Sequence, residues 1–216
     1  MEDIVIVGAG GFGREVKMLI DQINHVNPTW NFLGYYDDNL NAKIDSDLLL
    51  GSTEQLLGVS EKLHVVVALG NPLTKKLVVS KLEANNAIQF ATLVHPSVWL
   101  DNSVTIDVGT IICSGNIITV DINIGRHVIL NLGCTVGHDS RIGDFSSFMP
   151  SVNISGEVEI EECVYAGTGA KIINQLTIGY NTVLGAGAVV TKSIPSGSTA
   201  VGMPAKVIKR SNDTAD

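Results

Sequence analysis

The chain has 216 residues, of which 45% are hydrophobic and 17% are charged, and its formal net charge at pH 7 is −8. This length suffices for one large hydrophobic core or two modest ones, and an acidic balance without any basic cluster argues against nucleic acid as a partner. Because no stretch combines a basic flank with a long apolar run, we expect a cytoplasmic protein with no signal peptide and no membrane partner.

Residues 1–94 alternate between strand-like and helix-like segments. β-Branched and aromatic runs predict strands at residues 3–7, 30–36, 64–69 and 89–94. Apolar residues at helical spacing predict helices at residues 14–23 and 73–85. This alternation predicts an α/β domain over residues 1–94, with a small Rossmann-like parallel sheet.

A glycine-rich turn, Gly8-Ala9-Gly10-Gly11-Phe12-Gly13, joins the first strand to the first helix. Without β-carbons the backbone can approach a phosphate, and the helix N-terminus offers free N–H groups to its charge. Asp37 or Asp38, which follow the second strand, could bind a ribose hydroxyl. The pattern leaves NAD and a nucleotide sugar both open, although so small a domain favours the smaller ligand. A purely structural role, in helix and sheet packing, is the third alternative.

From Leu100 to Val190 an apolar residue falls at every sixth position, sixteen times in one register. In a chain that is 45% hydrophobic, such a series would arise by chance about once in a few hundred thousand trials. The series is Leu100, Ile106, Ile112, Ile118, Ile124, Leu130, Val136, Ile142, Phe148, Ile154, Ile160, Ala166, Ile172, Ile178, Leu184 and Val190.

A period of six fits short strands joined by tight corners, with three strands and eighteen residues to a coil. Stacked coils place residues eighteen apart side by side and give a continuous apolar column. The repeat resembles the left-handed parallel β-helix of the hexapeptide-repeat acyltransferases. We therefore expect a left-handed β-helix at residues 95–210, after the α/β domain, and a polar, disordered tail at residues 211–216.

The three cysteines, Cys113, Cys134 and Cys163, are odd in number and show no CxxC spacing. We expect them to be small buried repeat positions, with no disulfide and no bound metal.

His138 follows an inward-facing repeat residue by two positions and should lie on an outward corner. A histidine with an unperturbed pKa of about 6.5 is suited to taking a proton near neutral pH, and Asp139 could orient its ring. We take the other four histidines, His25, His64, His95 and His127, to be incidental surface residues.

The coil count places Gly156 and then Asn174 in one column with His138. A glycine beside the base leaves its N–H free to hold the oxygen of a tetrahedral intermediate. We therefore predict His138 as general base and the Gly156 N–H as oxyanion donor.

A second corner column should contain Pro150, Thr168, Ala186 and Pro204. These compact residues could form a track for an extended pantetheine arm, or they could merely ease the corners. A single β-helix is convex at every corner, so a cleft requires a neighbour. A homotrimer with its active sites between subunits would supply one.

Five motifs together resemble the sugar O- and N-acyltransferase family, which includes the sialic acid O-acetyltransferases and the bacillosamine-pathway N-acetyltransferase. They are the glycine-rich turn, Tyr36-Asp37-Asp38, Ala68-Leu69-Gly70-Asn71, Gly137-His138-Asp139 and Val201-Gly202-Met203-Pro204-Ala205-Lys206. The resemblance implies transfer of acetyl from acetyl-CoA, as co-substrate, to the amino group of a nucleotide-linked 4-amino-4,6-dideoxy sugar.

The resemblance also implies roles for individual residues. It makes His138 the base and Asp139 the acid beside it. Acetyl-CoA contacts fall on Ser147, Gly156, Thr168 and Ala186. Contacts with the nucleotide sugar fall on Gly10, Gly11, Phe12, Asp37, Asp38, Gly70 and Asn71.

The chain departs from the family at two positions, because some relatives carry histidines where it has Ser147 and Phe12. The first departure bears on acetyl positioning, and the second on the sugar diphosphate. Two other functions stay open at this point: O-acetylation of a sugar such as sialic acid, and a non-catalytic nucleotide-binding scaffold. The nucleotide itself, uridine, thymidine or guanosine diphosphate, is also open.

Overall fold

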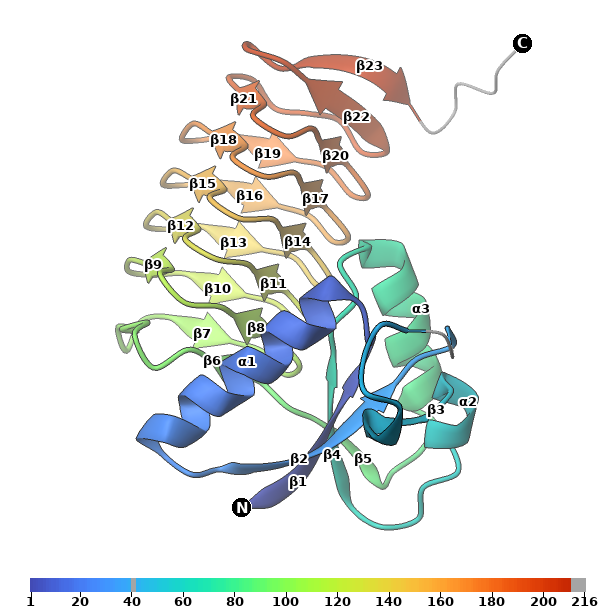
Figure 1. Cartoon of the computed structure of the whole chain (residues 1–216). Helices are drawn as coiled ribbons and strands as arrows, with labels where there is room; N and C mark the ends of the chain where they lie inside the picture. Colours follow the sequence, from blue (N-terminus) through green and yellow to red (C-terminus); the bar gives the residue numbers. More distant parts are fainter. Residues whose placement is uncertain (40–41, 211–216) are drawn as a thin grey trace, which may run out of the picture.

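The protein is described by a computed structural model that covers residues 1–39 and 42–210. It has an N-terminal α/β domain, here called the head, and a stack of coils that rises from it (Figure 1). The expected tail at residues 211–216 lies outside the described residues. Within the described ranges, no helix has both the length and the apolar character that crossing a membrane requires.

The head contains one five-stranded parallel sheet with the strand order β3-β2-β1-β4-β5. Its strands are β1 (Glu2–Val7), β2 (Trp30–Tyr36), β3 (Leu49–Gly51), β4 (Leu63–Val67) and β5 (Ile88–Phe90). Its helices are α1 (Gly11–Val26), α2 (Thr53–Leu56) and α3 (Pro72–Leu82), with a 3₁₀ turn at Ser46–Leu48. No sequence signal predicted β3, α2 or this turn.

The alternation of side chains in β1 explains why helices cover both faces of this sheet. Ile4 and Ile6 pack in the same cluster as Leu19 and Ile20 of α1. The intervening Val5 and Val7 pack with α3 and with the coil stack on the other face. A strand buried on both faces reads as a continuous apolar run, as β1 does.

The coils form a left-handed parallel β-helix with three sheets, in which strands β6 to β21 have two residues each. The first sheet contains β7 (Thr105–Ile106), β10 (Asn123–Ile124), β13 (Arg141–Ile142), β16 (Glu159–Ile160) and β19 (Thr177–Ile178). The second contains β9 (Ile117–Ile118), β12 (Thr135–Val136), β15 (Asn153–Ile154), β18 (Lys171–Ile172) and β21 (Val189–Val190).

The third sheet packs against the head at its lower coils and is called the head-facing sheet. It contains β6 (Leu93–Val94), β8 (Ile111–Ile112), β11 (Ile129–Leu130), β14 (Ser147–Phe148), β17 (Tyr165–Ala166), β20 (Val183–Leu184), β22 (Ser198–Val201) and β23 (Lys206–Arg210). The outward positions Ile111, Ile129 and Ser147 are buried there, because the head covers them.

The predicted period of six and the coil of eighteen residues are confirmed by the ladder register. Thr135 pairs with Asn153 and Val136 with Ile154, each eighteen residues apart. All sixteen repeat residues belong to, or pack against, one hydrophobic cluster inside the β-helix. Such a column is buried only because neighbouring coils cover one another.

Each corner of the β-helix has one residue with positive φ, again at every sixth position. Glycine takes this conformation at no steric cost, whereas a side chain there is strained. The series is Gly109, Gly115, Asp121, His127, Gly133, Asp139, Phe145, Ser151, Glu157, Cys163, Gly169, Gln175, Asn181 and Gly187.

Two sequence expectations are corrected by the ladders. The single strand expected at residues 89–94 is two strands, because β5 pairs with β4 in the head whereas β6 pairs with β8 in the β-helix. At the other end, Leu184 pairs with Ala200, a spacing of sixteen. The last coil is therefore shorter, and Pro204 does not stack on Ala186 as expected.

Candidate active site

His138 lies at the corner between β12 and β13, and its side chain is 56% exposed. Its Nδ1 is 2.8 Å from Oδ2 of Asp139. Because a carboxylate only accepts hydrogen bonds, Nδ1 donates, and a neutral ring then carries its lone pair on Nε2. The arrangement leaves Nε2 as the proton acceptor, on a ring that Asp139 holds in one orientation.

Gly156 lies directly against this ring in the next coil, as the coil count predicted. A β-carbon at Gly156 would stand 2.5 Å from Nε2 of His138. The carbonyl of His138 accepts from the N–H of Glu157 at 2.7 Å, which fixes the two corners on each other. Within the described ranges, the Gly156 N–H has no hydrogen-bond acceptor. A free donor beside a base is the geometry that an oxyanion requires.

Thr168 and Ala186 stack at a different corner, between the head-facing sheet and the second sheet. The N–H of Gly187 donates to the Thr168 carbonyl at 2.8 Å, and that of Gly169 donates to Pro150 at 2.9 Å. Thr168 and Ala186 are exposed, so this corner offers an open surface of compact residues. Within one chain, this corner and the His138 corner lie on different edges of the β-helix.

Ser147 has a different environment from the one expected. Its side chain is fully buried, and its hydroxyl accepts a hydrogen bond from Nζ of Lys75 at 2.9 Å. The structure of the single chain therefore provides no open surface at Ser147 on which acetyl-CoA could lie.

The glycine-rich turn lies at the carboxyl end of β1, where the order of the sheet changes direction. β1 pairs with β2 on one side and with β4 on the other. Open parallel sheets bind ligands in the crevice at such a point. The loop after β4, with Gly70 and Asn71, follows the neighbouring parallel strand and so begins at the same edge of the sheet.

The backbone of the glycine-rich turn is exposed at Gly10 and Gly11 and closely packed at Gly13. A β-carbon at Gly13 would overlap the Gly8 carbonyl, so the third glycine lets α1 pack closely on β1. Gly10 and Gly11 are exposed, with no atom near the position of a β-carbon. Gly10 caps α1 without a side-chain hydrogen bond. The first N–H groups of α1 are therefore available to an anion.

The two aspartates after β2 are both engaged with backbone N–H groups. Asp37 accepts from Ala9 and from Asn39, each at 2.7 Å, and so braces the glycine-rich turn. Asp38 accepts from the backbone and the hydroxyl of Thr53, and these bonds lower the pKa of its carboxyl.

Phe12 and Asn71 have structural partners of their own. Phe12 is half-buried against the cluster under α1. The Asn71 side chain accepts from the Thr74 N–H at 2.9 Å and caps α3. Its amide nitrogen is still a potential donor.

A cavity of about 460 Å³ opens between the head and the head-facing sheet. No sequence signal predicted this cavity. The head side is formed by residues 70–73, which include Gly70 and Asn71. The β-helix side is formed by Met149, Cys163, Tyr165, Asn181 and Val183. Among the described residues that line the cavity, none carries a charged side chain.

The expectation that His127 is a surface residue is wrong. It is 1% exposed, with its ring 4.7 Å from that of Phe90 and 5.4 Å from that of Phe145. Burial lowers the pKa of His127 to about 3. A sequence signal existed, because His127, Phe145 and Cys163 occupy the repeat position at which other coils have a glycine, such as Gly109 and Gly169.

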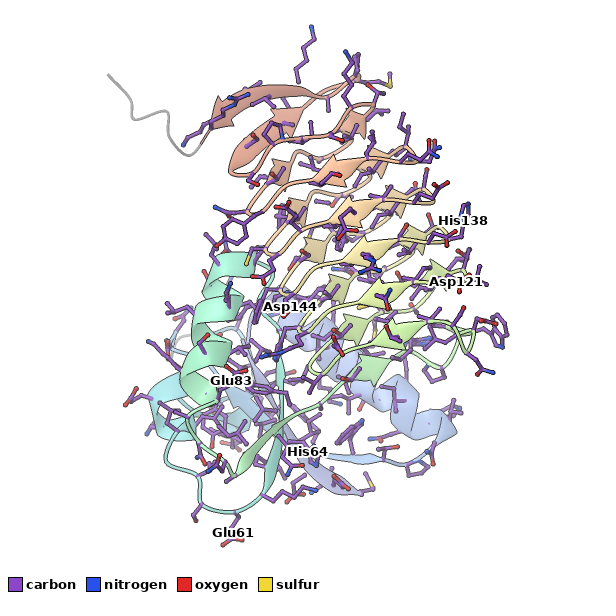
Figure 2. All side chains as sticks on the ribbon, turned by 180° about the vertical axis from the view of Figure 1, so that it is seen from behind. Glu61, His64, Glu83, Asp121, His138 and Asp144 are labelled. Carbon is purple, nitrogen blue, oxygen red and sulfur yellow. The ribbon has the colours of Figure 1, made fainter. Side chains whose placement is uncertain are left out.

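The proposed base and the head lie on different sides of one chain. In Figure 2, His138 lies at the edge of the β-helix farther from the head, whereas Asp144 lies at the edge nearer to it. The structure thus joins His138, Asp139 and Gly156 in one group and the glycine-rich turn, Gly70 and Asn71 in another. Among the described residues, no three His, Cys, Asp or Glu side chains are grouped as metal ligands.

Comparison with known proteins identifies relatives over nearly the whole chain. Residues 3–82 match the model of the PglD N-terminal domain. A GDP-perosamine N-acetyltransferase from Escherichia coli O157:H7 is 34% identical over 95% of this chain and 96% of its own length.

Two solved structures share the fold at similar coverage. PerB from Caulobacter crescentus, in complex with CoA and GDP-perosamine, has a TM-score of 0.83 and 28% identity, over 97% of this chain and 98% of that one. The acetyltransferase domain of PglB from Neisseria gonorrhoeae FA1090, in complex with acetyl coenzyme A, has a TM-score of 0.87 and 28% identity, over 96% and 99%.

Proposed function

Because this chain belongs to the family of sugar N-acetyltransferases that includes the GDP-perosamine N-acetyltransferases, we propose that it transfers acetyl from acetyl-CoA to a nucleotide-linked amino sugar. The observation that carries the proposal is the corner at which Nε2 of His138, whose ring is held by Asp139, lies against Gly156, a residue whose N–H has no acceptor within the described ranges. Base and oxyanion donor lie side by side on a scaffold whose relatives bind CoA.

The proposed reaction is an acyl transfer in which His138 first accepts and then returns one proton. The neutral sugar amine attacks the thioester carbonyl, and the carbonyl oxygen becomes negative. Nε2 of His138 takes the proton that the amine loses, and the Gly156 N–H donates to the oxyanion. Collapse of the intermediate breaks the carbon–sulfur bond, and the departing thiolate takes the proton from His138. The products are the N-acetyl sugar and coenzyme A.

We infer that the acceptor nucleotide binds at the carboxyl end of β1, at the switch point where the strand order of the head sheet changes direction. The free N–H groups of Gly11 and the residues after it suit its diphosphate. Asp37 and Asp38 stand beside that position for the ribose, and Gly70 and Asn71 lie across the crevice. The relatives favour a GDP-linked 4-amino-4,6-dideoxy sugar as the first substrate to test.

A homotrimer would complete the site. The His138 corner and the Thr168 corner bound opposite edges of the second sheet. A threefold axis facing that sheet would put the His138 corner of one subunit beside the Thr168 corner and the head of the next. Acetyl-CoA would then lie between subunits, along Thr168 and Ala186, with its thioester at His138.

The test is release of coenzyme A, measured with a thiol reagent. The purified protein is given acetyl-CoA and a panel of GDP-, dTDP- and UDP-linked 4-amino-4,6-dideoxy sugars. We expect release with at least one amino sugar and none with its hydroxyl analogue. Nucleotide binding without release on any member of the panel would support the scaffold alternative, and release with hydroxyl sugars would support O-acetylation.

A further inference from the structure

Lys75 is a lysine without any exposure, at the contact between the head and the β-helix. Its Nζ donates to Oγ of Ser147 at 2.9 Å and lies 3.4 Å from the Ser146 carbonyl oxygen. Both acceptors are neutral. Lysine is almost never fully buried unless its charge is paired.

The other groups around Lys75 do not supply a negative charge either. Within the described residues, the titratable side chains that act on it are Cys163 and His127, from two corners of the β-helix. Burial holds the pKa of the Lys75 amine well below its usual value. Burial also raises the pKa of the Cys163 thiol, so this thiol stays neutral near pH 7. The Lys75 amine therefore has only neutral hydrogen-bond partners where the two domains meet.

The contact lies behind the cavity and joins its two sides. Lys75 is in the first turn of α3, where its N–H donates to the Asn71 carbonyl at 2.9 Å. The residues just before it, 70–73, form the head side of the cavity. Ser147 pairs in the ladder with Tyr165, on the β-helix side. The Lys75–Ser147 hydrogen bond thus joins the helix that follows one side of the cavity to the strand beside the other side.

The cavity is suited to the sugar of the nucleotide-linked substrate. It begins at Gly70 and Asn71, which border the crevice at the switch point. Apolar surface from Leu73, Met149 and Val183 matches a deoxy sugar. Because the described lining carries no charge, it does not stabilise an ammonium ion, and the neutral amine that can attack a thioester is favoured.

We propose that Lys75 is a positioning residue for the acceptor: by tying the first turn of α3 to β14, it fixes the width of the cavity that holds the amino sugar. The proposal rests on the proposed function for the identity of that sugar. Lys75 does not touch the reacting atoms. It determines how the sugar is seated, and therefore how its amine is presented to the acyl group.

The test compares Lys75→Met with wild type by calorimetry and kinetics. Methionine fills a similar volume and removes the donor. We expect affinity for the complete nucleotide sugar to fall about tenfold, while affinity for the nucleoside diphosphate alone and KM for acetyl-CoA change less than about twofold. Lys62→Met is the matched control, because Lys62 is exposed at the amino end of β4 and should match wild type throughout.

Two further variants keep the result interpretable. Ser147→Ala removes the acceptor and should shift sugar affinity in the same direction, and the double variant should lose little more than either single one. If Lys75→Met does not fold, Lys75→Gln, which keeps a donor, replaces it and should retain more of the sugar affinity than Ser147→Ala.

Sugar affinity at the wild-type level in the folded Lys75→Met variant would overturn the proposal. Equal loss for nucleotide, nucleotide sugar and acetyl-CoA would also overturn it, since that result indicates general damage to the fold. Calorimetry needs no turnover, so a wild type that binds the nucleotide sugar but releases no coenzyme A refutes the proposed function alone. A wild type that binds none of the panel contradicts both.

Discussion

At the scale of single residues, the ring of His138 has one nitrogen engaged and one free. Asp139 holds Nδ1 at 2.8 Å, and Nε2 points away over Gly156. A base is useful only when its orientation and tautomer are fixed, and a neighbouring residue fixes both here. Asp139 itself lies at a corner position with a positive φ of +58°.

Replacing His138 by alanine should therefore lower the turnover rate without changing the affinity for the nucleotide. We expect kcat to fall by about 10² to 10⁴, the usual contribution of a general base, with unchanged affinity for the nucleoside diphosphate. Thiol release and calorimetry measure the two quantities. A variant with nearly full activity would remove His138 from the mechanism.

Gly156 to alanine tests the neighbouring donor by steric means. The new methyl group would stand 2.5 Å from Nε2 of His138, so the ring must leave its position. We expect kcat to fall at least about a hundredfold while the melting temperature changes little, because Gly156 does not require a positive φ. Activity close to wild type would show that catalysis does not require the His138 ring to lie against Gly156.

At the scale of elements, the corners of the β-helix differ in what their positive-φ residues do. Those that face solvent, such as Gly169, have space around them. Those that face the head carry His127, Phe145 and Cys163, whose side chains are buried against it. A strained side chain costs about 1–3 kcal/mol, so packing between the two domains must compensate for it.

Two glycine substitutions separate strain from packing. Gly169→Ala meets only the strain of a positive φ of +71°, and should destabilise by about 1–2 kcal/mol. Gly109→Ala has a similar φ, +77°, but its methyl group would also overlap the His127 ring. We expect Gly109→Ala to be the more destabilising by at least about 1 kcal/mol in urea unfolding. Equal effects would mean that His127 moves freely.

At the scale of the whole molecule, neutral groups buried between head and β-helix link stability to pH. The folded pKa of His127 is about 3, below its ordinary value of 6.5. Between these values the unfolded chain binds a proton that the folded chain does not. Unfolding therefore becomes more favourable as the pH falls through this range, by at most about 1.4 kcal/mol per pH unit.

His127→Phe should remove this contribution while keeping an aromatic ring between Phe90 and Phe145. We expect the free energy of unfolding to fall less steeply from pH 6.5 to pH 4 in the variant than in wild type. Urea unfolding at several pH values measures both slopes, and carboxylate titration cancels in the comparison. Parallel slopes would show that His127 is solvated.

Assembly is the second property of the whole molecule, and mixed subunits can test it. His138→Ala removes the base, and Gly11→Glu should repel the diphosphate from the glycine-rich turn. If each site combines the base of one subunit with the head of another, co-expression of the two inactive variants should restore part of the activity. Sites built within one chain would give no restoration.

The period of six determined most of the β-helix by itself. It identified the buried column, the coil of eighteen residues and the contact of His138 with Gly156, because each rests on a rule that repeats along the chain. Local sequence also predicted the glycine-rich turn and the strands at residues 3–7 and 30–36, because each depends only on residues close together in the chain.

Only the tertiary structure decided which outward positions are covered. Ser147 and Tyr165 occupy equivalent outward positions in neighbouring coils, yet the head buries the first and leaves the second lining the cavity. The partner of Ser147 is Lys75, 72 residues away. The repeat pattern describes which side chains face the inside of the β-helix. It carries no information about what packs against the outside, because that depends on where a separate domain docks.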